Sequence, residues 1–176
     1  MAILLIISMA IVTTGCTGLK DLQDKATGIA SENIEDVSSG LNIKTIEAMA
    51  GNDRKISLLY IRVTTQAGSS SVNLSEVIIH MSDGKGLFDL LYEPDSNVKK
   101  GFNVKPLIDT GLKFSPDKPL IEKGDFASIT IDTAQNGIDL GSGDILQISF
   151  ESAKGNKAHP LEIDLGTLNV GLNRLY

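Results

Sequence analysis

A chain of 176 residues suits one domain of ordinary size and an additional segment, and its 41% hydrophobic content supports a packed core. The net charge is −6, and the 16 lysines and arginines are spread along the chain, which argues against a nucleic-acid-binding surface. The single cysteine excludes an internal disulfide, and with only two histidines the sequence has too few ligands for the usual kind of zinc site.

The N-terminal segment differs in composition from the rest of the chain. Residues 1–12 carry no charge, and Ser8 is their only polar side chain. As a helix they would extend roughly 18 Å, which is shorter than the ~30 Å hydrocarbon core of a membrane. The less apolar residues 13–19 would extend this helix to nearly the required length.

An amphipathic helical pattern follows over residues 19–37. Its apolar positions recur at spacings of three and four, with charged residues between them. These positions are Leu19, Leu22, Ala26, Ile29, Ala30, Ile34 and Val37. Ser38 and Ser39 then lead to Gly40, a suitable residue for ending a helix.

Three interpretations compete for this segment. A cleaved secretory signal normally begins with a basic region, which residues 1–12 lack. A lipoprotein leader would use Cys16, which follows a small residue, although Thr13 stands where such leaders usually have leucine. A retained assembly helix would be apolar all round where it is buried among copies of itself. The helical period that runs on to Val37 favours this third interpretation.

The remainder of the chain has the pattern of short strands separated by turns. Strands are predicted to begin at residue 41 and to cover residues 56–65, 77–81, 87–92, 126–131, 145–150 and 161–165, with a looser region over residues 100–117. Regular short strands of this kind are typical of an antiparallel, immunoglobulin-like β-sandwich. We therefore predict an α+β protein, with an assembly helix over residues 1–39 and a β-sandwich over residues 40–176.

Few residues suggest chemistry. The glycine-rich residues 137–144 open no helix and contain no lysine, so a hairpin loop explains them better than a phosphate site. His80 lies in an apolar strand, where a core or rim histidine is expected, and His159 lies in a loop; the residues around them do not suggest a pair of nucleophile and base. We predict no enzymatic activity and no cofactor.

Two features of the predicted sandwich leave alternatives open. Its carboxylates could be solvated strand faces, or several of them could hold a hard cation such as Ca²⁺ between loops. The residues concerned are Asp132, Asp139, Asp144, Glu162 and Asp164. Asn73 begins the sequence Asn-Leu-Ser, which is an acceptor motif for N-glycosylation beside a serine-rich loop.

Several segments, in the same order, resemble archaellin, the archaeal flagellin. These are residues 25–28 and 35–43, the Asn-Leu-Ser strand entry at residues 73–79, and the Gly-Asp strand entry at residues 122–131. The resemblance implies a type IV pilin-like helix in the core of a filament, an outer immunoglobulin-like β-domain with N-linked glycans, and a rotary motor that turns the filament. Archaellins are made with a short basic leader cut after glycine, which residues 1–12 do not contain.

We accordingly predict an extracellular structural subunit of the archaeal flagellum (archaellum), associated with a membrane only before assembly. Its partners would be further copies of itself in a helical filament, other archaellins, and the basal motor of the archaellum. The residues predicted to pack in the filament core are Ile3, Leu4, Leu5, Ile6, Ile7, Met9, Ile11, Val12, Leu19, Leu22, Ala26, Ile29 and Ile34. The alternatives are a membrane- or lipid-anchored β-sandwich, such as an adhesin or stator component, and a secreted hydrolase.

Overall fold

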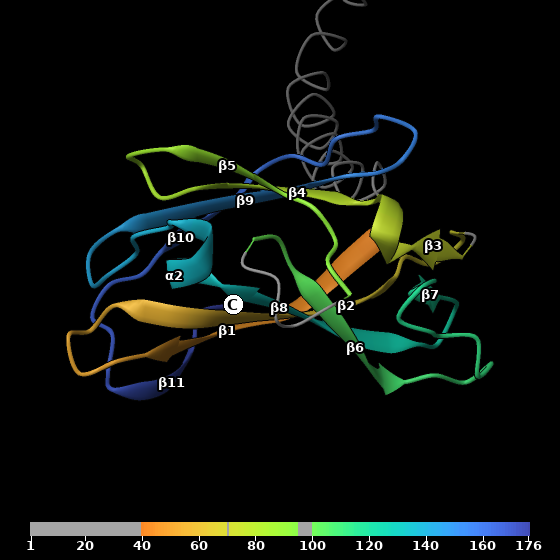
Figure 1. Cartoon of the computed structure of the whole chain (residues 1–176), viewed down its shortest axis with the longest axis horizontal. Coiled ribbons are helices and arrows are strands. Elements are labelled where there is room, and N and C mark those ends of the chain that lie inside the picture. The colour runs from red at the N-terminus through yellow and green to blue at the C-terminus, as the bar shows by residue number, and fades with distance from the viewer. Residues whose placement is uncertain (1–39, 70, 95–99) are drawn as a thin grey trace, which may run out of the picture. The chain divides into compact units, whose positions relative to one another are not determined.

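The computed structural model describes residues 40–69, 71–94 and 100–176. This part of the chain is built mostly of antiparallel strands in two main layers (Figure 1). The predicted helix over residues 1–39 and its boundary with the sandwich lie outside the described residues and stay predictions. No helix in the described ranges is long and apolar enough to cross a membrane.

The lower layer in Figure 1 is a five-stranded antiparallel sheet in the order β11-β1-β2-β8-β6. Its strands are β1 (Leu41–Ala50), β2 (Ile56–Thr65), β6 (Asn103–Ile108), β8 (Phe126–Asp132) and β11 (Gly171–Arg174). The register shifts between Ile43 and Thr45, so Lys44 forms a bulge in β1. Strand β2 lies at the centre and pairs with β1 on one side and β8 on the other.

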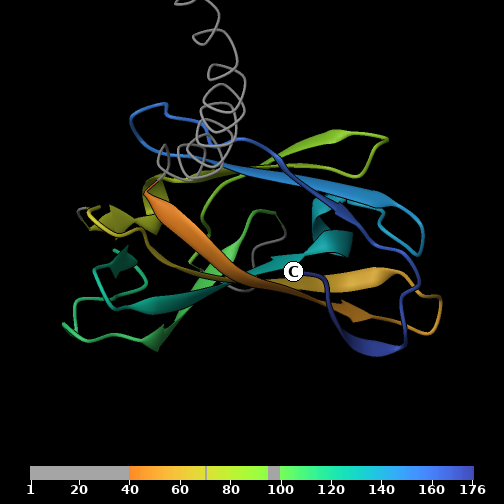
Figure 2. The same cartoon turned by 180° about the vertical axis from the view of Figure 1, so that it is seen from behind.

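The upper layer is a four-stranded antiparallel sheet in the order β10-β9-β4-β5, and Figure 2 shows the two layers from behind. Its strands are β4 (Ile78–Ser82), β5 (Leu87–Leu90), β9 (Ile145–Glu151) and β10 (Leu161–Asp164). Smaller elements join the layers: the pair β3 (Val72–Asn73) and β7 (Leu120–Ile121), the 3-10 helix η1 (Leu74–Glu76) and the short helix α2 (Thr133–Asn136).

The core lies between the sheets because alternate side chains of each strand point inward. The fully buried large side chains include Ile46, Leu59, Ile61, Ile129 and Ile131 from the five-stranded sheet, and Ile79, Met81 and Leu146 from the four-stranded sheet. Each such burial stabilises the fold by about 1.5–3 kcal/mol relative to exposure. Aliphatic residues therefore build a core that contains no tryptophan.

The structure confirms the predicted strands and corrects three details. Strand β6 runs through the region predicted to be loose, and strand β11 was not predicted. The glycine-rich residues 137–144 are not a hairpin loop, because β8 and β9 belong to different sheets and α2 separates them. Gly137 ends α2 in the left-handed conformation, with φ of 75°, and the chain then crosses from one layer to the other.

Candidate functional site

The predicted filament-core residues, from Ile3 to Ile34, and Cys16 lie outside the described residues. Their role as an assembly surface stays a prediction. The candidate sites that the structure does place are the Asn73 turn, the acidic residues, His80 and the two outer faces of the sandwich.

The Asn73 side chain caps the 3-10 helix η1. Its Oδ1 atom accepts hydrogen bonds from the backbone N–H of Ser75 at 3.3 Å and from the Ser75 hydroxyl at 2.8 Å. Its Nδ2 atom, where a glycan would be attached, donates to Glu76 at 2.8 Å. Leu74, between Asn73 and Ser75, is fully buried and anchors the turn. Asn73 thus has a structural role in the folded chain, and its glycosylation stays a prediction.

At one end of the sandwich, Asp83 joins two turns. Its Oδ1 atom accepts from the backbone N–H groups of Lys85 and Gly86 at 2.9 and 2.8 Å, and its Oδ2 atom accepts from that of Asp139 at 3.1 Å. Burial alone would raise the pKa of Asp83, but these backbone hydrogen bonds hold it below its usual value. The carboxylate therefore fixes the β4–β5 turn against the loop after α2.

Two lysines flank Asp139 on the surface of the same end. Lys55 Nζ lies 2.7 Å from Asp139 Oδ1, and Lys85 Nζ lies 3.3 Å from Asp139 Oδ2. The hydrogen bond from Lys55, followed by that from Lys85, lowers the pKa of Asp139, and the same bond raises the pKa of Lys55. All three side chains are about half exposed, so these ion pairs add little to stability.

At the opposite end of the sandwich, the Asp125 carboxylate likewise connects two segments of the chain through hydrogen bonds. Its Oδ1 atom accepts from the Thr110 hydroxyl at 2.6 Å and the Thr110 backbone N–H at 2.8 Å, while Oδ2 accepts from Glu122 N–H at 2.8 Å. Burial acts to raise the pKa of Asp125, and the Thr110 and Glu122 hydrogen bonds bring it below the usual value. The Gly-Asp strand entry found in the sequence is thus a buried turn-closing carboxylate.

His80 lies on the outward side of β4 between two carboxylates. Its Nδ1 atom is 2.6 Å from Asp89 Oδ1 and its Nε2 atom is 2.9 Å from Glu151 Oε2. Strand register explains the contacts, because Asp89 is its direct partner on β5 and Glu151 lies diagonally opposite on β9. The imidazole therefore bridges three strands. Among the hydrogen bonds of the described residues, none brings a nucleophilic side chain to His80.

The five carboxylates that could have formed a cation site are not brought together. Asp132 caps α2, Asp144 closes its own turn by accepting from Gly141, and Asp164 does the same with Gly166. Asp139 binds lysines, as described above, and Glu162 accepts from Gln147. Across the described ranges, no group of three or more His, Cys, Asp or Glu side chains is arranged to hold a metal ion.

A shallow hollow of about 460 Å³ lies along the edge strand β5. Its lining comes from β5 and its continuation, from Lys100 and Gly101, and from Asn136 of α2. The Asn136 side chain holds Gly101 through two hydrogen bonds, from Gly101 N–H to Oδ1 and from Nδ2 to Gly101 O. The Asn136 amide in this lining is therefore already used to connect α2 to the chain before β6.

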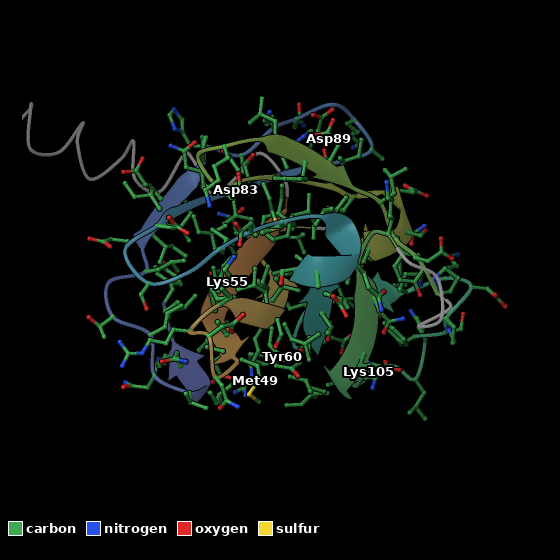
Figure 3. All side chains as sticks on the ribbon, turned by 60° about the vertical axis from the view of Figure 1, so that its left-hand side comes forward. Met49, Lys55, Tyr60, Asp83, Asp89 and Lys105 are labelled. Carbon is green, nitrogen blue, oxygen red and sulfur yellow. The ribbon has the colours of Figure 1, made fainter. Side chains whose placement is uncertain are left out.

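The outer face of the five-stranded sheet combines apolar and basic side chains. Met49 of β1 is paired in register with Leu58 of β2 and Leu172 of β11, so these three form one row across the sheet. Leu172 is 58% exposed although it is apolar. The neighbouring rows contribute Tyr60, Arg62, Lys105 and Arg174, and Figure 3 shows Met49, Tyr60 and Lys105 along this side.

The outer face of the four-stranded sheet is acidic. Asp89, Glu151, Glu162 and Asp164 lie on it, together with His80 and the exposed apolar residues Leu87 and Ile145. Asp89 and Glu151 share the imidazole of His80, whereas Glu162 and Asp164 on β10 have no basic partner in the part of the chain that the structure describes. Figure 3 shows Asp89 on the side of the sandwich opposite to Met49 and Lys105.

Sequence analysis did not identify these two faces as a site. The sequence of β2 does indicate one of these faces, because Leu58, Tyr60 and Arg62 occupy the outward positions between core residues. Large apolar side chains at outward positions of a strand indicate an interaction surface. The Leu172 contribution could not be found in this way, because β11 was not predicted.

The described part therefore defines a class of protein: an antiparallel β-sandwich with side chains suited to interaction on both outer faces. The chain belongs to the archaeal-type flagellin family, whose family model matches residues 1–160. This confirms the resemblance found in residues 25–43, 73–79 and 122–131.

Individual relatives agree with this assignment. Flagellin B2 of Methanocaldococcus jannaschii is 29% identical over 139 residues, which cover 68% of this chain and 63% of the relative. Flagellin B4 of Pyrococcus abyssi is 30% identical over 136 residues, covering 64% of this chain and 62% of the relative. The chain thus spans less than two thirds of the length of these curated relatives.

Solved structures confirm the fold. The crystal structure of flagellin FlaB1 of Methanocaldococcus jannaschii superposes with a TM-score of 0.65 at 16% identity, covering 78% of this chain and 96% of the other. The archaeal flagellum of Methanospirillum hungatei strain JF1 gives a TM-score of 0.56 at 14% identity, covering 90% and 84% of the two chains. At these identities the likeness concerns the fold alone.

Proposed function

We propose that this chain is a structural subunit of the archaellum filament and that it acts in swimming motility at the cell surface. The match of the archaeal-type flagellin family to residues 1–160 is the observation that carries the proposal. The β-sandwich shared with flagellin FlaB1 supports it. The domain would be an immunoglobulin-like outer module, and no catalytic step is assigned to it.

Assembly would depend on the helix predicted over residues 1–39. Thirteen apolar residues between Ile3 and Ile34 would pack against equivalent helices of other copies. Burial of a large apolar side chain is worth about 1.5–3 kcal/mol, so a charge placed in this seam would oppose assembly strongly. The archaellum motor and other archaellins would be the further partners.

Electron microscopy of cells that carry a variant as their only copy tests this proposal. Leu5→Asp or Ile7→Asp should abolish filaments, whereas the conservative changes Leu5→Ile and Ile7→Val should leave them. Normal filaments from the aspartate variants would overturn the proposed assembly helix. Mass spectrometry of purified filaments adds a second test: a subunit that begins at a lipid-modified Cys16 would favour the anchored alternative over an assembly helix.

A further inference from the structure

We propose that neighbouring subunits meet through the two opposite faces of the sandwich, the outer face of the five-stranded sheet of one copy against the outer face of the four-stranded sheet of the next. This inference rests on the proposed filament function and assigns the surfaces by which the outer domains pair. Charge complementarity between the faces identifies a second copy of this chain as the occupant.

The outer face of the five-stranded sheet has the composition of an interface. Met49, Leu58, Tyr60 and Leu172 form its apolar part, and protein interfaces are enriched in tyrosine, methionine and arginine. Its three cations are Arg62, Lys105 and Arg174.

The unpaired positive charges of this outer face lie on the two edge strands of the five-stranded sheet. Arg62 is neutralised by Glu47 at 3.0 Å, and Asp132 is occupied as the cap of α2. Lys105 on β6 and Arg174 on β11 are exposed, and neither makes an ion pair within the described ranges. Arg174 and Lys105 lie on opposite edge strands, four strand spacings or roughly 19 Å apart, so one edge strand of a partner can neutralise only one of them. Arg174 is paired in register with Glu47, which leaves Lys105 as the cation for the partner.

The outer face of the four-stranded sheet supplies the complementary surface. Four carboxylates lie on its strands against the single imidazole of His80, and Glu162 and Asp164 are exposed on its edge strand β10. Leu87, which is 87% exposed, and Ile145, which is 47% exposed, offer apolar area to the partner's Met49, Leu58 and Leu172. With Leu87 on β5 set against the apolar row and β10 set against β6, Lys105 would lie opposite Glu162 and Asp164, and Arg174 on the far edge strand would stay outside this ionic contact.

The geometry of this contact suits a filament. The two faces lie on opposite sides of one sandwich, so each subunit can use both at once (Figure 3). A contact between two different surfaces of the same molecule is heterologous, and it produces an open helical array when its rotation does not close a ring. The outer domains would thereby reinforce the array that the N-terminal helices begin.

Zero-length crosslinking of assembled filaments tests the pairing directly in the unaltered protein. A carbodiimide couples a lysine amine to a carboxylate only when the two are in contact. Within one copy, Lys105 and Glu162 or Asp164 are on opposite sides of two sheets packed about 10 Å apart, so a link between them must join two copies. Filaments assembled from a mixture of ¹⁴N- and ¹⁵N-labelled chains should give mixed-label peptides containing Lys105 joined to Glu162 or Asp164.

Charge reversal provides the second test. Lys105→Glu, or Glu162→Lys with Asp164→Lys, should each reduce the sedimentable filament fraction at low salt by about tenfold or more, because like charges then face one another. Combining these three changes in one chain should restore that fraction to within about twofold. Lys118→Glu is the matched control for Lys105→Glu, since it makes the same charge change in the Ser115–Lys118 turn, outside the strands of both faces, and should assemble normally.

The outcomes separate the two proposals. Failure of the unaltered chain to form filaments would count against the proposed function itself. If filaments form but Lys105 is linked only to other carboxylates, the pairing is wrong while the function stands. Assembly of both charge-reversed variants to the level of the unaltered chain, or no restoration when their changes are combined, would likewise overturn the pairing.

Discussion

The Oδ2 atom of Asp83 accepts a hydrogen bond of 3.1 Å from the backbone N–H of Asp139, 56 residues further along the chain. Because Oδ1 of the same buried carboxylate holds the N–H groups of Lys85 and Gly86, one side chain serves three backbone donors. A buried donor left without a partner costs about 1–3 kcal/mol. The stability of this end of the sandwich should therefore depend on Asp83 more than on the exposed ion pairs around it.

Two substitutions at Asp83 should have graded effects. Asp83→Asn can keep the bonds to Oδ1 and loses the one to Oδ2, so we expect a loss of about 1 kcal/mol in the free energy of unfolding. Asp83→Ala loses all three and should cost about 2–3 kcal/mol. Urea unfolding of the purified chain measures both values, with the exposed Asp117→Asn as control. Equal stability of Asp83→Ala and the control would contradict the assignment.

Acid should weaken the fold through Asp83 and Asp125. The pKa of each carboxyl is held below its usual value in the folded chain, so the folded state binds fewer protons than the unfolded state. The stability that these groups contribute is complete above the pKa of an unfolded aspartate, about 3.9, and is lost as the pH falls from there through the lower folded values. Measured from pH 7 to pH 2, the unfolding free energy of Asp83→Asn with Asp125→Asn should fall less steeply below pH 4 than that of the unaltered chain. Identical slopes would rule out both carboxylates as the source.

Capping and glycosylation at Asn73 can be separated by choosing the residue to change. Asn73→Ala removes the cap of η1 and should cost about 1 kcal/mol whether or not a glycan is present. Ser75→Ala destroys the acceptor motif but keeps the hydrogen bond from the backbone N–H of residue 75 to Asn73. If Asn73 is glycosylated, the intact mass of filament subunits should drop by the mass of the glycan in both variants. A mass that changes only by the amino-acid substitution would refute the glycosylation and would not bear on the cap.

Core and outward residues of the same sheet should respond differently to truncation. Leu59 is fully buried, so Leu59→Ala should destabilise the fold by about 2–5 kcal/mol through lost burial and the cavity left behind. Leu172 is more than half exposed, so Leu172→Ala should change the free energy of unfolding by less than about 0.5 kcal/mol. The same Leu172→Ala variant should nevertheless weaken filaments. A large loss of folding stability in Leu172→Ala would mean that the outer face is part of the core instead.

Local sequence predicted the central strands well and the edges poorly. The bounds of β2 were predicted to the residue because its β-branched pattern is interrupted sharply by turn residues at both ends. Strand β6 lacked that signal, since Pro106 and the exposed Leu107 and Ile108 break the alternation, as an edge strand permits. Strand β11 has only four residues and is held by its pairing with β1, which no local pattern reveals.

The candidate site depended on long-range register in the same way. His80 was recognised as a strand residue, but its contact with Glu151 spans 71 positions and follows from the pairing of β4 with β9. The glycine-rich loop was predicted to be a hairpin because turn residues mark a reversal without saying which sheet the chain enters next. The apolar row of Met49, Leu58 and Leu172 likewise exists only once three strands are in register.

The pairing of β11 with β1 also determines when this domain can fold. Strand β1 can form a hairpin with β2 as soon as both are synthesised, yet its other edge waits for residues 171–174, and β2 waits for β8. β-Sandwiches fold slowly because the chain loses the entropy of closing such long loops before the non-local contacts form. A nascent chain would therefore expose unpaired strand edges until residues 171–174 have been synthesised, which gives a chaperone or an export apparatus time to engage it before the sheets close.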